Sequence, residues 1–139
     1  MSQENVERFI EVTEAFNRFA EEFDRDALES LIGFYDPDVK FEPQQATLQG
    51  GYSGRRGVRQ WLADVVEHYG RGGHLDYADI QDLGNRVLGL GTLRFSGRGS
   101  GIETEAPVAI MATFQNGLIT HLKDYGEEDR ALEAVGRRE

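Results

Sequence analysis

The spacing of apolar residues changes once along this chain of 139 residues, and the change limits the folds that it can adopt. Over roughly residues 1–70, apolar residues recur every three or four positions, as in amphipathic helices. From residue 74 to 125, short apolar segments alternate with glycine-rich turns, as in a sheet. Helices followed by strands predict an α+β domain, with the helices packed on an antiparallel sheet.

Four helices are expected. The first spans about residues 3–23, where an apolar stripe follows the helical period and Ser2 can cap the start. In the second, Asp26 and Glu29 resemble a capping box, and Pro37 ends the helix because the residue before a proline avoids helical angles. The other two are a helix over 58–69 that ends in glycines and a short helix over 127–135.

Five strands are expected, and two of the turns between them are short. Asn116-Gly117 is a strong hairpin signal, and Gly84-Asn85 is a second two-residue turn. A polar, glycine-rich loop is expected over 44–57. The strands are expected at 39–42, 74–83, 86–96, 103–115 and 118–125.

Two glycines, Gly89 and Gly91, fall inside an expected strand, where glycine weakens the pairing. They indicate a bend in the sheet or a close approach to its face, or else simple tolerance of glycine. The sequence leaves these alternatives open.

Composition weighs against several classes of function. The 25 acidic and 15 basic residues give a net charge of −10, which disfavours nucleic acids and anionic membrane surfaces as partners. The chain has no cysteine, which excludes disulfides, zinc thiolates and thiol nucleophiles. It has no apolar stretch of about 18 residues, and its polar, acidic start is unlike a signal peptide. We therefore expect a cytoplasmic protein.

No motif for a metal or another cofactor is found. The three histidines, His68, His74 and His121, lack the spacing of a metal site. The glycine-rich segment 97–101 leads into a strand, whereas a phosphate loop opens a helix. We expect no cofactor.

Five segments, in their order and spacing, resemble the SnoaL-like branch of the nuclear-transport-factor-2-like superfamily. They are YDPDVKFEP at 35–43, GRRGV at 54–58 before a Trp-containing helix, AP at 106–107, NG at 116–117 and DRALEA at 129–134. The resemblance covers nearly the whole chain and implies one domain over residues 1–139. It also implies a cone-shaped, curved antiparallel sheet around three N-terminal helices, with a short C-terminal helix. An apolar pocket would lie at the open end, and family members often dimerise through the outer sheet face.

Glu42 is one candidate for acid–base catalysis. In the ketosteroid isomerase branch of the superfamily, a carboxylate directly before a proline, just after the second helix, is the general base, and Glu42-Pro43 matches that place. This chemistry needs a carboxylate close to a substrate C–H, in surroundings apolar enough to raise its pKa. The alternative is a glutamate at the end of an edge strand that faces solvent.

Asp124 is the other candidate. Side chains alternate along a strand, so if Leu122 faces the interior, Thr120 and Asp124 do as well, whereas His121 and Lys123 face outward. Asp124 also resembles the aspartate that SnoaL-like cyclases use late in a strand as acid and base. The alternative is a charge at a strand end that pairs with a neighbour or caps the following helix.

Five further residues are expected to shape the pocket. Tyr35, Tyr52 and Trp61 each combine an apolar body with a polar tip, which suits a ligand wall. Ile110 and Leu122 are expected on the inner face of the sheet. Trp61 can instead be an ordinary core residue, and Tyr52 lies in the loop that is expected to rim the pocket.

The chain departs from the isomerase branch at two positions. That branch stabilises an oxyanion with a tyrosine on the first helix and a protonated acid on the next-to-last strand, and the matching residues here are Val12 and Ile110. Neither donates a hydrogen bond, so steroid-type isomerisation is not expected. The epoxide hydrolase branch needs two acids bridged by an arginine. Arg94 and Asp124 could supply two members, but Ile110 stands where another acid would be expected.

Three hypotheses follow. The first is an enzyme that performs cofactor-free acid–base chemistry on a small, largely apolar carbonyl compound, as an isomerase, cyclase or dehydratase, with Asp124 or Glu42 as the acid and base. The second is a non-catalytic module of the same fold that binds a small apolar molecule. The third is a protein-interaction module that uses the outer sheet face. In each case a homodimer is expected.

Overall fold

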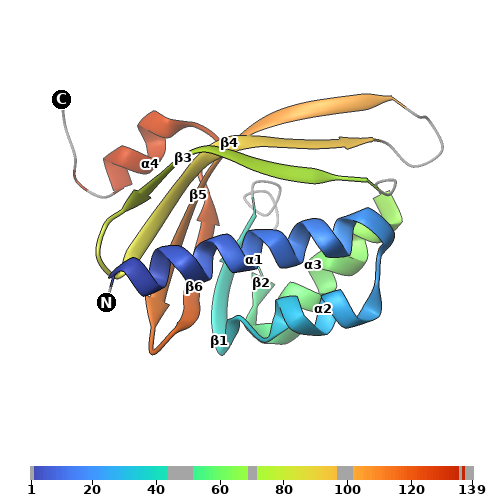
Figure 1. Ribbon diagram of the computed structural model, residues 1–139, viewed down its shortest axis with the longest axis horizontal. Helices are drawn as coiled ribbons and strands as arrows, with labels where there is room; N and C mark the ends of the chain where they lie inside the picture. Colours follow the sequence, from blue (N-terminus) through green and yellow to red (C-terminus); the bar gives the residue numbers. More distant parts are fainter. Residues whose placement is uncertain (1, 44–51, 69–71, 97–101, 135, 137–139) are drawn as a thin grey trace.

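The computed structural model describes residues 2–43, 52–68, 72–96, 102–134 and 136. These residues form four helices and one six-stranded sheet that is curved but not closed, which confirms the α+β class (Figure 1). The elements are, in chain order, α1 (Ser2–Glu22), α2 (Arg25–Ile32), β1 (Tyr35–Glu42), β2 (Tyr52–Ser53), α3 (Gly54–His68), β3 (His74–Asp82), β4 (Arg86–Ser96), β5 (Glu103–Gln115), β6 (Leu118–Asp124) and α4 (Glu128–Ala134).

The strands lie in the order β2-β1-β6-β5-β4-β3. From β3 to β6, each strand pairs antiparallel with the next one along the chain, as the expected turns require. In the β5–β6 turn, Asn116 and Gly117 have φ angles of 54° and 80°, the left-handed conformation that tight hairpins favour. β1 instead pairs parallel with β6, so the expectation of a purely antiparallel sheet is wrong at this pair. A parallel pair needs a long connection, and here α3 and four strands, β2 to β5, supply it.

Helices α1, α2 and α3 lie on one side of the sheet, and α4 lies on the other (Figure 1). The apolar stripe of α1 packs on the inner face, where Phe9 is almost fully buried. Asn17 holds α1 against the edge strand β3, because its side chain accepts from the Leu75 N–H at 2.8 Å and donates to the Leu75 carbonyl at 3.0 Å. On the outer face, Ala131 of α4 covers Leu88 and neighbouring residues.

The second helix and the strand after it begin earlier than expected. Asp24, not Asp26, caps α2, since its side chain accepts a hydrogen bond from the Ala27 N–H at 2.9 Å. The helix ends at Ile32, and Pro37 lies inside β1, because that strand already starts at Tyr35.

The expected loop over 44–57 also proves partly ordered. Tyr52–Ser53 forms β2, and α3 begins at Gly54 rather than Val58. The rest of that loop, the 97–101 link and the expected helix ends at Tyr69 and Val135 lie outside the described residues.

Gly89 and Gly91 allow close approaches to the sheet. A Cβ atom on Gly89 would lie 2.6 Å from Cε1 of Tyr77 and 2.7 Å from Cε2 of Phe9. A Cβ on Gly91 would collide with the backbone of Asp76, beside the irregularity in β3 between Tyr77 and Asp79. Of the alternatives left open by the sequence, close approach therefore holds at both positions.

Candidate functional site

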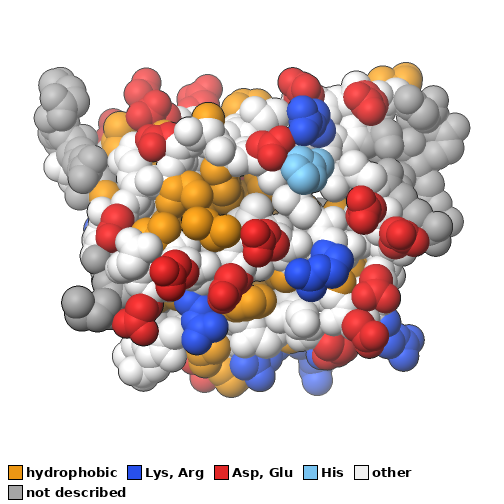
Figure 2. Space-filling model, in the orientation of Figure 1, with side chains coloured by type: hydrophobic (Ala, Val, Ile, Leu, Met, Phe, Trp, Pro, Cys, Tyr) orange, Lys and Arg blue, Asp and Glu red, His pale blue; other side chains and the backbone are white. Residues whose placement is uncertain are grey.

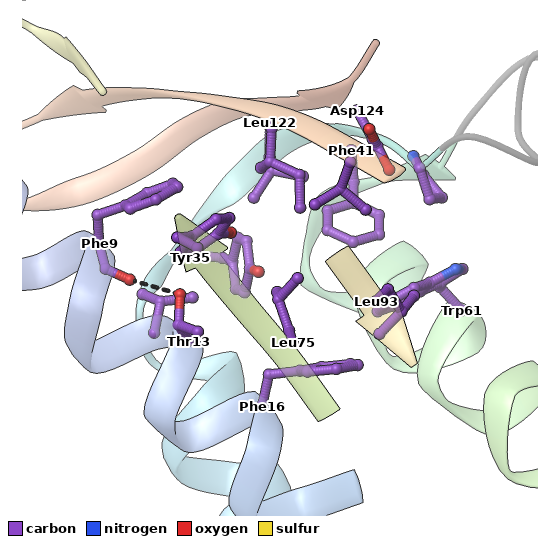
Figure 3. Close-up of a pocket in the computed structure, with 15 residues that line it drawn as sticks. Phe9, Thr13, Phe16, Tyr35, Phe41, Trp61, Leu75, Leu93, Leu122 and Asp124 are labelled. Atoms are coloured by element: carbon purple, nitrogen blue, oxygen red, sulfur yellow. Dashed lines mark hydrogen bonds between the residues drawn. The ribbon is translucent and has the colours of Figure 1, made fainter. Parts of the chain in front are cut away.

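A pocket lies between α1, α3 and the inner face of the sheet, and 15 residues line it (Figure 3). Its cavity volume is about 80 Å³, which accommodates several water molecules or a small organic group. Six lining residues are aromatic, namely Phe9, Phe16, Tyr35, Phe41, Trp61 and Tyr77. The lining contains no Lys, Arg or His, so Asp124 is the one charged side chain among the described residues that line it.

Asp124 is the last residue of β6 and pairs with Ile110 on β5. Its Oδ1 accepts hydrogen bonds from the backbone N–H groups of Ala109, at 3.1 Å, and Gly126, at 2.9 Å. Burial raises the pKa of Asp124, and these two hydrogen bonds oppose part of that rise. Oδ2 has no hydrogen-bond partner within the described part of the chain. One oxygen is therefore fixed by the backbone, and the other is available to a ligand.

Two tyrosine hydroxyl groups belong to the same pocket. Tyr35 is only 4% exposed, and its hydroxyl makes no hydrogen bond to any described residue. Burial raises the pKa of Tyr35 and of Tyr77. A hydrogen bond with Thr13 opposes the rise at Tyr77, whereas the neighbouring Tyr35 hydroxyl and the Asp124 carboxylate add to it. Both phenols therefore stay neutral at ordinary pH. Tyr35 can donate a hydrogen bond into the pocket, and Tyr77 can do so when its hydroxyl turns away from Thr13, whose own proton goes to the Phe9 carbonyl.

Aromatic contacts fix one wall of the pocket. Trp61 of α3 stacks on Phe16 of α1, with ring centroids 5.9 Å apart, and lies against Phe41 of β1 at 5.1 Å. Phe9 stacks on Tyr77 at 5.0 Å, over the space that Gly89 leaves open. Trp61 thus lines the pocket and also packs against the core, which combines the two roles that the sequence left open.

The GRRGV segment positions the start of β1. The Nε of Arg55, in the first turn of α3, donates to the carbonyl oxygen of Tyr35 at 2.7 Å. Gly57 packs so closely on Tyr52 that a Cβ would lie 2.9 Å from the Tyr52 Cβ. These contacts hold β1 and β2 against α3, and so place Tyr35 at the pocket.

Of the sequence-predicted residues, Tyr35, Trp61, Ile110, Leu122 and Asp124 line the pocket together. Figure 3 shows Asp124 and Leu122 reaching into it from the same strand.

Thr120, expected on the same face as Leu122 and Asp124, does not line the pocket. An irregularity between Thr113 and Phe114 shifts the pairing of β5 with β6, and Ile119 is the fully buried residue instead. The hydroxyl of Thr120 donates to the Thr113 carbonyl at 3.3 Å. Strict alternation along β6 was therefore wrong at this position.

Glu42 does not line the pocket. It follows Phe41, which faces inward, and pairs in the sheet with Lys123. Its Oε2 lies 2.5 Å from Nε2 of His121. Burial alone would raise the pKa of Glu42, but the hydrogen bond to His121 and the charges of Lys123 and His121 lower it overall. The geometry therefore gives no support to Glu42 as the base of this pocket, and it matches the partly solvent-facing alternative more closely.

Tyr52 and Arg94 also lie apart from the pocket lining. The Tyr52 hydroxyl donates to Oδ2 of Asp64 at 3.1 Å. Arg94 pairs with the exposed Asp76, with Nη2 and Oδ2 2.8 Å apart, so it does not bridge acids as the epoxide hydrolase branch requires.

Sequence reasoning missed Tyr77 and Thr13, the polar residues that line the pocket from β3 and α1. A signal for Tyr77 was present, because Leu75 and Tyr77 alternate on one face of an expected strand. Thr13 lies four residues after Phe9 and donates to its carbonyl at 3.0 Å (Figure 3), as a threonine inside a helix commonly does.

The described residues contain no group of three His, Asp or Glu side chains placed to hold a metal ion. Among the described helices, none is long and apolar enough to span a membrane.

Comparison with known proteins gives a family and a fold. The family described as the SnoaL-like domain matches residues 16–122. A search of curated proteins finds no match. Similar solved structures include a protein of unknown function from Burkholderia pseudomallei that is described as NTF2-like. It is 20% identical, with 96% of this chain and 98% of that chain covered and a TM-score of 0.74.

Two other similar structures contain small molecules. TerC, co-crystallised with polyporic acid, is 20% identical over 96% of this chain and 99% of its own, with a TM-score of 0.73. A protein from Catenulispora acidiphila with a ketosteroid isomerase-like fold, in complex with trimethylamine, is 18% identical over 92% of this chain and 94% of its own, with a TM-score of 0.66. Identities this low establish the fold alone. The family match covers most of the chain, and the chain therefore belongs to the SnoaL-like domain family of the nuclear-transport-factor-2-like fold.

Proposed function

We propose that the protein binds a small, largely apolar carbonyl compound and that Asp124 moves a proton on it, in a reaction of the isomerase, cyclase or dehydratase type. One observation carries the proposal. Asp124 is a partly buried carboxylate with one oxygen fixed by two backbone N–H groups and the other without a partner among the described residues, beside an aromatic pocket. Because the pocket wall is apolar, it favours a ligand of the same character.

The raised pKa of Asp124 suits this role. An ordinary aspartate is a weak base near pH 7, whereas burial makes the ionised form of Asp124 hold a proton more strongly. Asp124 would take a proton from the carbon next to the carbonyl, and the C–H electrons would form an enolate. In a β,γ-unsaturated carbonyl compound, the enolate extends over the neighbouring C=C bond, so return of the proton from Asp124 to the γ-carbon completes an isomerisation and regenerates the carboxylate.

The two tyrosines supply the complementary group. As the enolate forms, negative charge develops on the carbonyl oxygen, and hydrogen-bond donors in an apolar site stabilise that charge. The hydroxyl groups of Tyr35 and Tyr77 are neutral donors in the same pocket as Asp124. They offer a substitute for the donors that Val12 and Ile110 cannot provide.

The similar structures support a small organic ligand. One was crystallised with polyporic acid and another with trimethylamine, so proteins of this fold accommodate such molecules. We also propose, from the family resemblance, a single domain over residues 1–139 that forms a homodimer in the cytoplasm. Sedimentation velocity tests the dimer, which should have twice the 15.6 kDa mass of one chain.

Deuterium exchange tests proton transfer without knowledge of the natural substrate. Small apolar ketones, such as cyclohexanone and 1-indanone, would be incubated with the protein in D2O near pH 7, and loss of the α-proton signals followed by NMR. Wild-type protein should accelerate exchange, and Asp124→Asn should reduce the acceleration about 100-fold or more. Tyr35→Phe and Tyr77→Phe should each reduce it as well.

Asp79→Asn is the matched control, since Asp79 is an exposed acid on β3 and its replacement changes the net charge by the same amount. Glu42→Gln tests the other carboxylate that the sequence indicated. Full exchange activity in Asp124→Asn, or its loss in Glu42→Gln alone, would contradict the assignment. Binding of the ketones without any exchange would favour the non-catalytic module.

A further inference from the structure

The electrostatic character of the pocket selects among ligands by charge. Six aromatic rings line it, and the face of each ring carries partial negative charge that attracts cations. Four of these rings stack in pairs, Phe9 on Tyr77 and Phe16 on Trp61, so each of the four has one face covered by its partner. Phe41 lies 5.1 Å from Trp61 with a ring angle of 57°, so these two rings do not cover each other fully. Rings arranged in this way form part of a box around a rounded cation.

Asp124 adds a full negative charge without a compensating cation. Within the described residues, no Lys, Arg or His lines the pocket. The two N–H groups on Oδ1 leave Oδ2 without a partner there. Asp124 is partly removed from water, which raises its pKa, and a cationic ligand would supply a partner for its charge.

The rest of the protein acts in the same direction. Its net charge of −10 attracts cations and repels anions over long range. Figure 2 shows acidic side chains spread over the face that carries α1. An anionic ligand would meet this field, the ring faces and Asp124, which all oppose it.

We propose that the pocket binds small alkylammonium cations, with the charged nitrogen between Asp124 and the aromatic wall. The inference rests on the pocket of the proposed function but not on proton transfer. A bound ammonium ion would occupy the carboxylate that a carbonyl substrate needs, so such cations would act as competitive ligands.

A set of isosteric probes isolates the charge. Choline is cationic, 3,3-dimethylbutan-1-ol has nearly the same shape without charge, and 3,3-dimethylbutanoate is an anion of similar size. Each would be titrated into ¹⁵N-labelled protein near pH 7, and dissociation constants taken from the amide shifts of pocket residues. We expect choline to bind at least about tenfold more tightly than the neutral alcohol, and the anion to show no binding.

Two variants locate the effect. Asp124→Asn keeps an oxygen that can accept from Ala109 and Gly126 but removes the charge, and it should reduce the preference for choline to about twofold or less. Asp79→Asn removes one negative charge as well, at an exposed position, and should keep the preference. The pair separates the local carboxylate from the overall field of the protein.

A pH titration of the wild type, compared with the same titration of Asp124→Asn, is a further test, because acid weakens the overall field equally in both proteins. Choline stays charged at every pH, so its binding should weaken as acid protonates Asp124. The other titratable groups in the lining are Tyr35 and Tyr77, which stay neutral because burial raises the pKa of each.

Equal affinity of the wild type for choline and the neutral alcohol, or an unchanged preference in Asp124→Asn, would overturn the inference. Deuterium exchange reads the proposed function independently. If the protein accelerates deuterium exchange of ketones but binds choline no more tightly than the neutral alcohol, only the cation inference fails. If it prefers choline but does not accelerate exchange, the cation inference is supported and only the proton-transfer role of Asp124 fails.

Discussion

A methyl group at position 89 would enter the space where two aromatic rings meet the sheet. In Gly89→Ala, the new Cβ would lie 2.6 Å from Cε1 of Tyr77, 2.7 Å from Cε2 of Phe9 and 2.8 Å from its Cζ. Carbon atoms pack favourably at about 3.5–4.0 Å, so both rings must retreat by about 1 Å. The rings are stacked on each other with centroids 5.0 Å apart, and neither can move alone.

The Gly89→Ala variant should lose stability because the added methyl group overpacks the core. Extra methyl groups in a well-packed core destabilise by about 1–3 kcal/mol, because side chains leave their preferred rotamers or the backbone shifts. For a domain of this size, that loss lowers Tm by about 3–12 °C. Since Phe9 and Tyr77 also line the pocket, the variant should change ligand affinity together with stability.

Urea and thermal unfolding, followed by circular dichroism, measure this effect. Gly33→Ala is the matched control, because Gly33 has an ordinary helical φ of −65° and its added Cβ would meet nothing closer than 3.5 Å. The free energy of unfolding of Gly33→Ala should equal that of the wild type or exceed it by up to about 1 kcal/mol. If Gly89→Ala were as stable as Gly33→Ala, the close approach of the rings would not constrain this position, and the reasoning would be refuted.

Two further predictions concern stability. Asp24→Ala should destabilise the protein by about 1 kcal/mol in urea unfolding, because it removes the N-terminal cap of α2. Asp26→Ala should have a much smaller effect. A larger loss of stability in Asp26→Ala than in Asp24→Ala would instead support Asp26 as the cap, as the sequence indicated. Asp124→Asn should stabilise the protein at pH 7, because a raised pKa means that the folded state disfavours the ionised carboxyl. This gain should shrink as the pH falls toward about 3.9, where the unfolded chain also binds the proton, and a gain that is independent of pH would contradict it.

The sequence predicted those parts of the fold whose signals are local. The hairpin at Asn116-Gly117 is specified by the two residues that form it, and the four helices follow from apolar spacing. The parallel pairing of β1 with β6 has no local signal, since it depends on how distant segments meet. The start of β1 was misplaced because Pro37 was taken to end a helix, although proline is compatible with a strand beside an irregularity in its pairing.

The pocket residues on β6 could be predicted where side chains alternate regularly between the two faces of the strand. Leu122 and Asp124 of β6 were expected at the inner face, where they lie. Alternation failed at Thr120 because a pairing irregularity, which depends on the partner strand, lies next to it. Glu42 was selected by its place before Pro43, but Phe41 takes the inward position in β1 and leaves Glu42 beside His121. The alternation of Tyr77 with Leu75 indicated that Tyr77 faces inward, but the space that Gly89 leaves for its ring depends on a second strand and has no signal within the first.

The pairing of β1 with β6 also bears on the order of folding. β3 to β6 join consecutive neighbours and can assemble by successive hairpins, a process that needs only short loops to close. β1 must wait for β6, since contacts such as the one between Glu42 and His121 join residues 79 positions apart. During synthesis, the strand that contributes Tyr35 and Phe41 to the pocket can pair with β2, but it stays without β6, which joins it to the rest of the sheet, until nearly the whole chain has been made. The ligand site is thus assembled late, and a chain truncated before β6 would lack both its carboxylate and the strand that seats its aromatic wall.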